Sequence, residues 1–201
     1  STRSHGTPDN PVDSTVWDRL KRAYRWIRTE IRTGSHGLVR MLAGDTAEGF
    51  DRTGIGGRGE SVLNSVQLCY ALRRLSELAR RHSDSEWAED IDTFLRDLDE
   101  AVAAAFDTCW FRRAYTDNGR PVGAYASGRA FTDVQAWAAL ARCGTATQRR
   151  QCLEAVLDAL PESPPGVPVS TRPYGPPPPG DVTGCSTPAG CGWNAGIVQP
   201  V

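Results

Sequence analysis

Lysine is nearly absent from this sequence, since Lys21 is the only one and arginine supplies the other positive charges. A surplus of charge of one sign is absent as well, because 23 basic and 24 acidic residues give a formal net charge of -1. Proteins that bind nucleic acid or anionic membranes usually carry a basic surplus. Neither partner is therefore expected.

Long apolar runs are also missing from the chain. No segment approaches the roughly 20 apolar residues that a membrane-spanning helix needs, so no membrane partner is expected. The first residues, STRSHGTPDNP, contain no apolar core of a secretory signal. We therefore expect a cytoplasmic protein.

Cysteines with metal or redox spacing are lacking, because none of the six forms a Cys-x-x-Cys motif. Cys185 and Cys191 are close enough in sequence to close a short loop in an oxidising compartment. The other four lie in or beside apolar helical patterns, where buried free thiols are expected: Cys69, Cys109, Cys143 and Cys152. His5 and His82 have no nearby ligand-type partners, so no metal site is expected.

Helical periodicity dominates the chain up to about Leu160. Apolar residues recur at three- and four-residue steps and predict helices over residues 13–32, 61–82, 85–106, 132–142 and 147–160. Asp13 or Ser14 is expected to cap the first helix. Five helices with long connections indicate an all-α fold, either an α/α barrel or an irregular bundle.

Two segments break this pattern. The run WFRRAYTDNGRPVG, residues 110–123, contains an Asp-Asn-Gly turn, which predicts a small hairpin or an extended loop. After Pro161, proline and glycine dominate, as in PYGPPPPGD, and such a composition cannot continue a helix. We expect one domain that is helical over residues 11–160 and irregular over residues 161–201.

The connection between the first two helices, LVRMLAGDTAEGFDRTGIGGRGE, is aperiodic and rich in glycine and charge. Asp45 and Glu48 lie beside glycines, which allow close approach to a ligand, and carboxyl groups can act as general acids or bind sugar hydroxyls. Arg52 and Arg58 can bind an anion such as phosphate. The alternative is a solvated loop whose acids cap the next helix and pair with its arginines.

The runs SHGLVRMLAGDTAEGF and GRGESVLNSVQLCYALRRLSELA resemble the catalytic-domain signature of glycoside hydrolase family 94. That family shows G-x-H-G-L-P, then G-D-W-N-D-G-M, then G-x-G-E-S-V-W before a helix. It includes cellobiose and chitobiose phosphorylases and the phosphorylase-like domains of cyclic β-1,2-glucan synthases. The likeness continues through WFRRAYTDNGRPVG and FTDVQAWAALA into PPPPGDVTG and GWNAGI, and so covers nearly everything after about residue 11.

The resemblance implies an (α/α)6 barrel of the six-hairpin glycosidase type. This chain would form roughly the second half of it, as a single partial catalytic domain over residues 1–201. Half a barrel would leave inner helix faces without partners, at Val66, Tyr70, Phe94 and Leu98. Self-association, or association with a missing N-terminal half, is therefore expected.

The activity implied by the resemblance is phosphorolysis of β-linked disaccharides or glucans to a sugar 1-phosphate, with inversion. Phosphate attacks the anomeric carbon, so a single protein carboxylic acid is needed, to protonate the leaving oxygen. The family's acid position falls on Glu48, with Asp45 as the second candidate. Inorganic phosphate is the co-substrate, and neither an organic cofactor nor a metal is implied.

Several departures from the family pattern predict weak turnover. Thr46 and Ala47 replace the Trp and Asn of the acid motif, Val39 replaces Pro, and Leu63 replaces an aromatic residue. The family's E-N-G-G pattern reads W-N-A-G here. The phosphate-binding His that follows it falls on Pro200 or later.

Six further residues are candidates for substrate binding: His36, Arg58, Glu60, Asp133, Gln135 and Asn194. His36 can touch phosphate or sugar, or can be a structural loop histidine. Glu60 can reach the sugar, or can merely favour the start of the second helix. Asp133 and Gln135 can line the cleft, although capping of the fourth helix by Thr132 or Asp133 is the plainer interpretation.

Three classes of function remain. The first is a phosphorylase-type enzyme, a glycosyltransferase acting on an oligosaccharide or disaccharide and phosphate. The second is a non-catalytic relative that binds saccharide or has a structural role. The third, an unrelated helical interaction protein, is disfavoured by the ordered series of motifs.

Overall fold

The computed structural model of the chain describes residues 14–42, 50, 52–158, 167–172, 180, 182 and 198–199. Three predicted site residues, Asp45, Glu48 and Asn194, lie outside the described residues, as does the pair Cys185 and Cys191.

The five predicted helices are confirmed, with ends that differ by a few residues from the expected ones. Their bounds are α1 Val16–Trp26, α2 Val62–Arg81, α3 Ser85–Ala104, α4 Thr132–Ala141 and α5 Ala146–Asp158, with a π-helical turn η1 Ile27–Ile31 and a 3-10 turn η2 Tyr125–Ser127. The predicted cap of the first helix is wrong. Thr15 is the N-cap, and it forms a capping box with Asp18.

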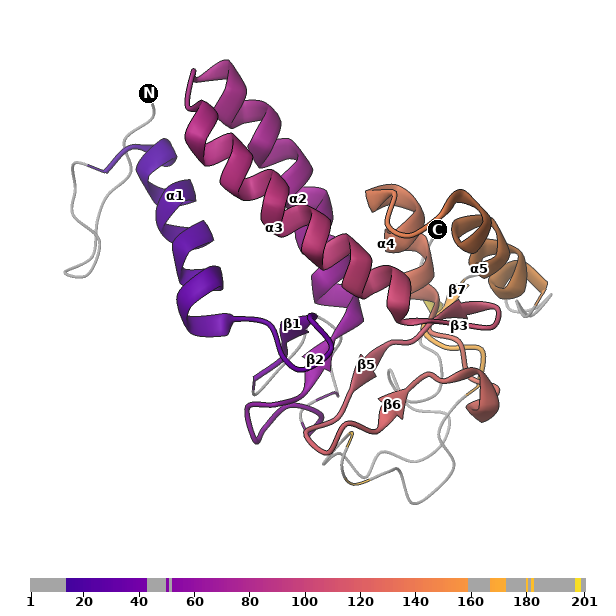
Figure 1. Cartoon of the computed structure of the whole chain (residues 1–201). Helices are drawn as coiled ribbons and strands as arrows, with labels where there is room; N and C mark the ends of the chain where they lie inside the picture. The colour runs from indigo at the N-terminus through magenta and orange to yellow at the C-terminus, as the bar shows by residue number, and fades with distance from the viewer. Residues whose placement is uncertain are drawn as a thin grey trace.

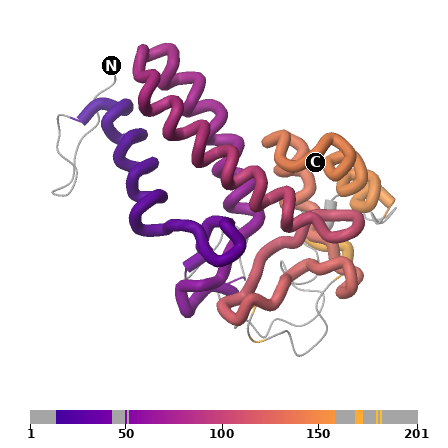
Figure 2. Tube along the Cα trace, in the orientation of Figure 1, coloured from indigo at the N-terminus to yellow at the C-terminus, as the bar shows by residue number. Residues whose placement is uncertain are grey.

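The helix pair α2 and α3 forms the centre of the molecule, running side by side in opposite directions (Figures 1 and 2). Helix α4 packs against α2, and α5 packs against α4. The spacing of apolar residues explains this core, because positions three and four apart share one face of a helix. The fully buried members in the central pair include Val62, Val66, Cys69, Leu72, Ile91, Leu98 and Val102.

The expectation of unpartnered inner faces is wrong for three of the four residues named. Val66 and Leu98 are fully buried and Phe94 is 8% exposed, because α2 and α3 cover each other. Tyr70 is 37% exposed, and its ring meets the edge of Trp137 at 5.8 Å. The chain therefore has its own core.

Helix α1 is attached to this core mainly by aromatic side chains. Trp17 stacks on His82 at 4.3 Å and meets Trp87 edge-on at 5.0 Å. The ammonium group of Lys21 lies 5.1 Å from the Trp87 ring centroid and forms an ion pair with Asp84.

Small sheets accompany the helices, so the fold is mostly helical rather than purely all-α. One antiparallel sheet has the order β1-β2-β5-β6, from β1 Val39–Arg40, β2 Glu60–Ser61, β5 Ala114–Tyr115 and β6 Pro121–Val122. Two further pairs join β3 Phe106–Asp107 to β4 Trp110–Phe111 and β7 Val167–Pro168 to β8 Val198–Gln199. The predicted hairpin is confirmed by the β5–β6 pair, which flanks the Asp117-Asn118-Gly119 turn.

The four-stranded sheet lies at the end of the central pair where α2 begins and α3 ends (Figure 1). The aperiodic connection between α1 and α2 does not run as a single loop. It is interrupted by β1, which pairs with β2. Across the described ranges, no helix has the length and apolar character needed to cross a membrane.

Candidate functional site

The four-stranded sheet joins three motif segments that are far apart in the sequence. Strand β1 follows the SHGL turn, β2 belongs to the GRGES motif, and β5 belongs to RRAYTDNGRPVG. The register places Arg40 opposite Glu60 and Glu60 opposite Tyr115. The motifs of the sequence analysis therefore meet at one end of the helices.

Glu60 is the centre of this arrangement, with its side chain almost completely buried. One carboxylate oxygen accepts hydrogen bonds from the backbone N–H groups of His36 and Leu38, at 3.0 and 3.1 Å. The other lies 2.5 Å from His36 Nδ1 and 3.4 Å from Ser35 Oγ. A Cβ on Gly34 would lie 2.4 Å from the Glu60 carboxyl carbon, so the turn requires glycine there.

Glu60 itself is not part of the second helix but directly precedes its N-cap. It lies in β2, and Ser61 is the N-cap of α2, accepting a hydrogen bond from the Asn64 N–H at 3.0 Å. The carboxylate of Glu60 therefore holds the turn of residues 34–38 against the sheet. Hydrogen bonds from N–H donors to a charged carboxylate are stronger than those between neutral groups.

His36 is oriented by two neighbours. Its ring stacks on Tyr115 with centroids 3.8 Å apart and an interplanar angle of 13°. Its Nδ1 faces the Glu60 carboxylate, so Nδ1 is the protonated nitrogen when that carboxylate is ionised. The side chain is 38% exposed. Nε2 is the ring nitrogen that does not face Glu60.

Asp117 holds the glycine-rich segment before β2, a role that sequence analysis missed. Its carboxylate accepts hydrogen bonds from the N–H groups of Gly56, Arg58 and Gly59, at 2.6, 2.7 and 2.8 Å. Partial burial would raise the pKa of Asp117, but these bonds together outweigh it and hold the pKa below its usual value. The signal available in the sequence was an aspartate in a turn and a distant GIGGRG run.

Arg58, a predicted anion-binding residue, is exposed and is anchored at the same place. Its Nε donates to the backbone oxygen of Asp117 at 3.0 Å. The guanidinium group thus has a defined position at the surface.

Asp133 pairs with Arg113, a fully buried arginine that sequence analysis also missed. Arg113 Nε lies 3.4 Å from an Asp133 carboxylate oxygen, and the guanidinium carbon lies 4.7 Å from the centroid of the Phe50 ring. Capping of α4 by Thr132 or Asp133 is wrong, because the N-cap residue is Phe131, with no side-chain cap bond. Asp133 compensates a buried charge instead.

Gln135 is fully buried and joins α4 to the β3–β4 hairpin. Its side-chain oxygen accepts a hydrogen bond from the Phe111 N–H at 2.9 Å. Its nitrogen donates to the backbone oxygens of Phe111 and Phe131 at 2.8 and 3.0 Å. Its contacts with the backbone thus position strand β4.

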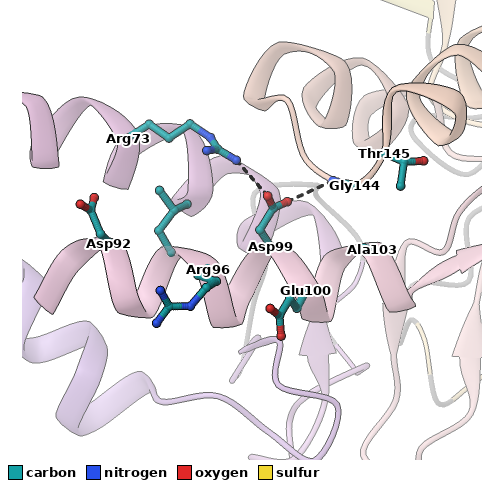
Figure 3. A pocket seen from close by; sticks show the side chains of 9 residues that line it. Arg73, Asp92, Arg96, Asp99, Glu100, Ala103, Gly144 and Thr145 are labelled. Atoms are coloured by element: carbon teal, nitrogen blue, oxygen red, sulfur yellow. Dashed lines mark hydrogen bonds and ion pairs between the residues drawn. The ribbon is translucent and has the colours of Figure 1, made fainter. Parts of the chain in front are cut away.

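Pockets in the described part of the chain differ in their relation to this site. One of about 420 Å³ lies beside the SHGL turn and is lined by Gly37, two arginines (Arg28 and Arg32), Asp97 and other residues. Another, of about 470 Å³, is drawn in Figure 3. None of the predicted site residues that the structure describes lines the second pocket.

The pocket in Figure 3 is crossed by a structural contact between three elements. Asp99 of α3 accepts hydrogen bonds from Arg73 of α2 and from the N–H of Gly144, each at 3.0 Å. These bonds fix the connection after α4 to the central pair. Within the described ranges, no group of three or more His, Cys, Asp or Glu residues could hold a metal ion.

Comparison with known proteins gives one family. The model of the glycosyl hydrolase 94 superfamily, catalytic domain, matches residues 7–198. A solabiose phosphorylase of Paenibacillus borealis is 34% identical over 164 residues, which are 80% of this chain and 21% of the relative. A 3-O-beta-D-glucopyranosyl-beta-D-glucuronide phosphorylase of the same organism is 31% identical over 157 residues, 77% of this chain and 20% of the relative.

A third relative is the cyclic beta-(1,2)-glucan synthase NdvB of Rhizobium meliloti (strain 1021). It is 31% identical over 132 residues, which are 64% of this chain and 5% of the relative. The chain thus spans about a fifth of the length of the two phosphorylases and a smaller share of the synthase.

Proposed function

The chain belongs to the glycosyl hydrolase 94 superfamily, and from this premise we propose that it is part of the catalytic domain of a phosphorylase. The proposed reaction transfers a β-linked glucosyl unit from a disaccharide or glucan to inorganic phosphate, with inversion. The two relatives that are phosphorylases support this reaction class. A cytoplasmic location is part of the proposal.

The observation that carries the proposal is the meeting of the motif segments in one sheet. The SHGL turn, the GRGES motif and the β5–β6 hairpin each contribute a strand, and Glu60 links the first two through its carboxylate. The four-stranded sheet gives a fixed position to the two ends of the connection between β1 and β2. Rigid support of this kind is what a reacting group requires.

In the proposed mechanism, a phosphate oxygen attacks the anomeric carbon while the glycosidic C–O bond breaks. A carboxylic acid donates its proton to the leaving oxygen, and no second protein carboxylate is needed as base. We assign the acid to Glu48 from the family motif, with Asp45 as the alternative. A working acid at this position needs a pKa raised by burial beside the sugar.

The described residues take supporting parts in this proposal. His36 presents Nε2 to phosphate or to a sugar hydroxyl, because Glu60 and Tyr115 fix the other edge and the face of its ring. Arg58 offers its guanidinium group to the phosphate anion. Asp133 and Gln135 act indirectly, through Arg113 and strand β4. Asn194 is assigned to substrate binding on the family pattern.

We also propose that the chain is the second half of an (α/α)6 barrel. The packing of α2 against α3 and of α4 against α5 supports this architecture. The departures at Thr46 and Ala47 favour low activity without the rest of the barrel, or a saccharide-binding role without turnover. The partner in the first case would be an N-terminal half or a second copy.

The test is phosphorolysis of β-linked glucosyl disaccharides, followed as release of sugar 1-phosphate, with reverse synthesis measured in parallel. We expect Glu48→Gln to abolish turnover and Asp45→Asn to weaken it, while saccharide affinity changes less. Turnover that is unchanged in Glu48→Gln would refute the assignment of the acid. Saccharide binding without phosphorolysis would favour the non-catalytic alternative, and absence of both would reject the proposed function.

A further inference from the structure

Residues 53–59 fold back tightly on the strand that precedes them. The Met41 N–H donates to the Gly59 oxygen at 2.9 Å. A Cβ on Gly54 would lie 2.8 Å from the Leu42 backbone oxygen, so the two chain segments are in contact there. Residues 41–42 and 53–59 therefore lie together and form one unit, called here the base.

Asp117 fastens this base from the β5–β6 turn. Its carboxylate uses both oxygens, one for the Gly56 N–H and the other for the N–H groups of Arg58 and Gly59. Its own N–H donates to the Thr53 oxygen at 2.9 Å, and its backbone oxygen accepts from Arg58 Nε. A single residue thus contacts the segment 53–59 near both of its ends.

The chemistry of this contact favours a carboxylate over other turn residues. Successive backbone N–H groups that converge on one point form a site of positive potential, which a negative charge stabilises. Hydrogen bonds to a charged acceptor are roughly twice as strong as neutral ones. A Cβ on Gly56 would lie 3.0 Å from the Asp117 carboxyl carbon, so glycine there permits the close approach.

We infer that Asp117 is a positioning residue, which holds the base formed by residues 41–42 and 53–59 and thereby places the Arg58 guanidinium group. For its catalytic consequence this inference rests on the proposed function, because the acid position lies in the chain between Leu42 and Thr53. Asp117 itself touches no reacting atom. Its effect passes through the backbone of residues 53–59.

The primary test is amide hydrogen exchange in the 201-residue chain. In Asp117→Ala, exchange of the Gly56, Arg58 and Gly59 amides should be at least about tenfold faster than in wild type. The Met41 amide, bound to Gly59, should also exchange faster. In Asp117→Asn the side-chain NH2 can face only one side, so protection should be lost mainly at Gly56 and kept at the other two amides.

The matched control is Asp107→Ala. Asp107 also accepts a backbone N–H, that of Tyr125 at 3.0 Å, and pairs with Arg112, but it lies in β3. Its replacement should leave exchange at residues 56–59 unchanged. Equal exchange in the two alanine variants, or an unchanged Met41 amide in Asp117→Ala, would overturn the inference.

Turnover supplies a separate readout. Where wild type carries out phosphorolysis, Asp117→Ala should lower kcat at least about tenfold with a smaller change in KM, because saccharide contacts remain while reacting groups are displaced. Unchanged kcat with fast exchange at residues 56–59 would also overturn the inference. A wild type that neither carries out phosphorolysis nor binds saccharide would reject the proposed function, and the Met41 amide would then decide the role of Asp117.

Discussion

Replacement of Glu60 by glutamine tests how much a buried carboxylate contributes to this fold. In wild type, one oxygen receives two backbone N–H groups, and the other receives His36 Nδ1 and the Ser35 hydroxyl. Glutamine has the same shape and no charge, so the side-chain oxygen can keep the backbone donors only if its NH2 faces His36. The neutral imidazole must then carry its proton on Nε2 and accept a hydrogen bond from the glutamine NH2 at Nδ1.

The expected loss follows from these bonds. A hydrogen bond to a charged group contributes about 1.5–3 kcal/mol and a neutral one about 0.5–1.5 kcal/mol. Two backbone bonds therefore weaken by about 1 kcal/mol each, and the Ser35 hydroxyl must turn to accept from the amide NH2 instead of donating. We expect Glu60→Gln to lower the free energy of unfolding by about 2–3 kcal/mol, and Tm by about 5–10 °C.

The assay is denaturant unfolding at neutral pH followed by far-UV circular dichroism, with nitrogen NMR of the His36 ring. The control is Glu77→Gln on α2, where both members of the pair with Arg74 have side chains more than half exposed. That change should stay within about 0.5 kcal/mol. A Glu60→Gln variant as stable as this control, or an unchanged His36 tautomer, would refute the reasoning.

Three further expectations concern single positions. Gly34→Ala should lower the free energy of unfolding by several kcal/mol because its Cβ meets the Glu60 carboxyl. Gly57→Ala is the control, with φ of +78° and nothing within 4 Å of the added Cβ, and should cost only about 1 kcal/mol. Denaturant unfolding curves of the two variants test this difference. The pKa of Asp117 is lowered in the folded state, so its ionised carboxylate contributes fully to the free energy of unfolding above the ordinary aspartate pKa near 3.9. That contribution is lost as pH falls through the lower folded pKa. In Asp117→Asn, the free energy of unfolding measured at a series of acid pH values should therefore fall less steeply. Arg113→Met should lower the free energy of unfolding by about 3–5 kcal/mol because it breaks the ion pair of Arg113 with Asp133, and replacing both residues together should restore part of that loss.

The local spacing of apolar residues was sufficient to locate the core where a neighbouring helix covers one whole helix face. Leu72 on α2 and Ile91 on α3 each lie three or four residues from the next apolar position, as on a single helix face, and both side chains are buried. The same pattern failed for α1. Val16 is 52% exposed, since the helix touches its neighbours through a few aromatic rings rather than along a full face.

The polar contacts of the candidate site were not predictable from local pattern. Asp117 lies 58 residues from Gly59, and Arg113 lies 20 residues from Asp133, so their pairing depends on the register of β2, β5 and α4. Glu60 was identified from its motif as a candidate site residue. Its donors were not foreseen, because they come from a turn that only β1–β2 pairing brings within reach.

The attachment of α1 makes the one lysine of this chain a built-in reporter of partial opening. Lys21 lies against the Trp87 ring and is paired with Asp84, so its ammonium group has these contacts only while α1 is docked. Segments held by few contacts detach at lower free energy than the core unfolds. Acylation of this single side-chain amine, together with the change in emission as Trp17 leaves Trp87, would therefore time the departure of α1 while α2 and α3 stay folded.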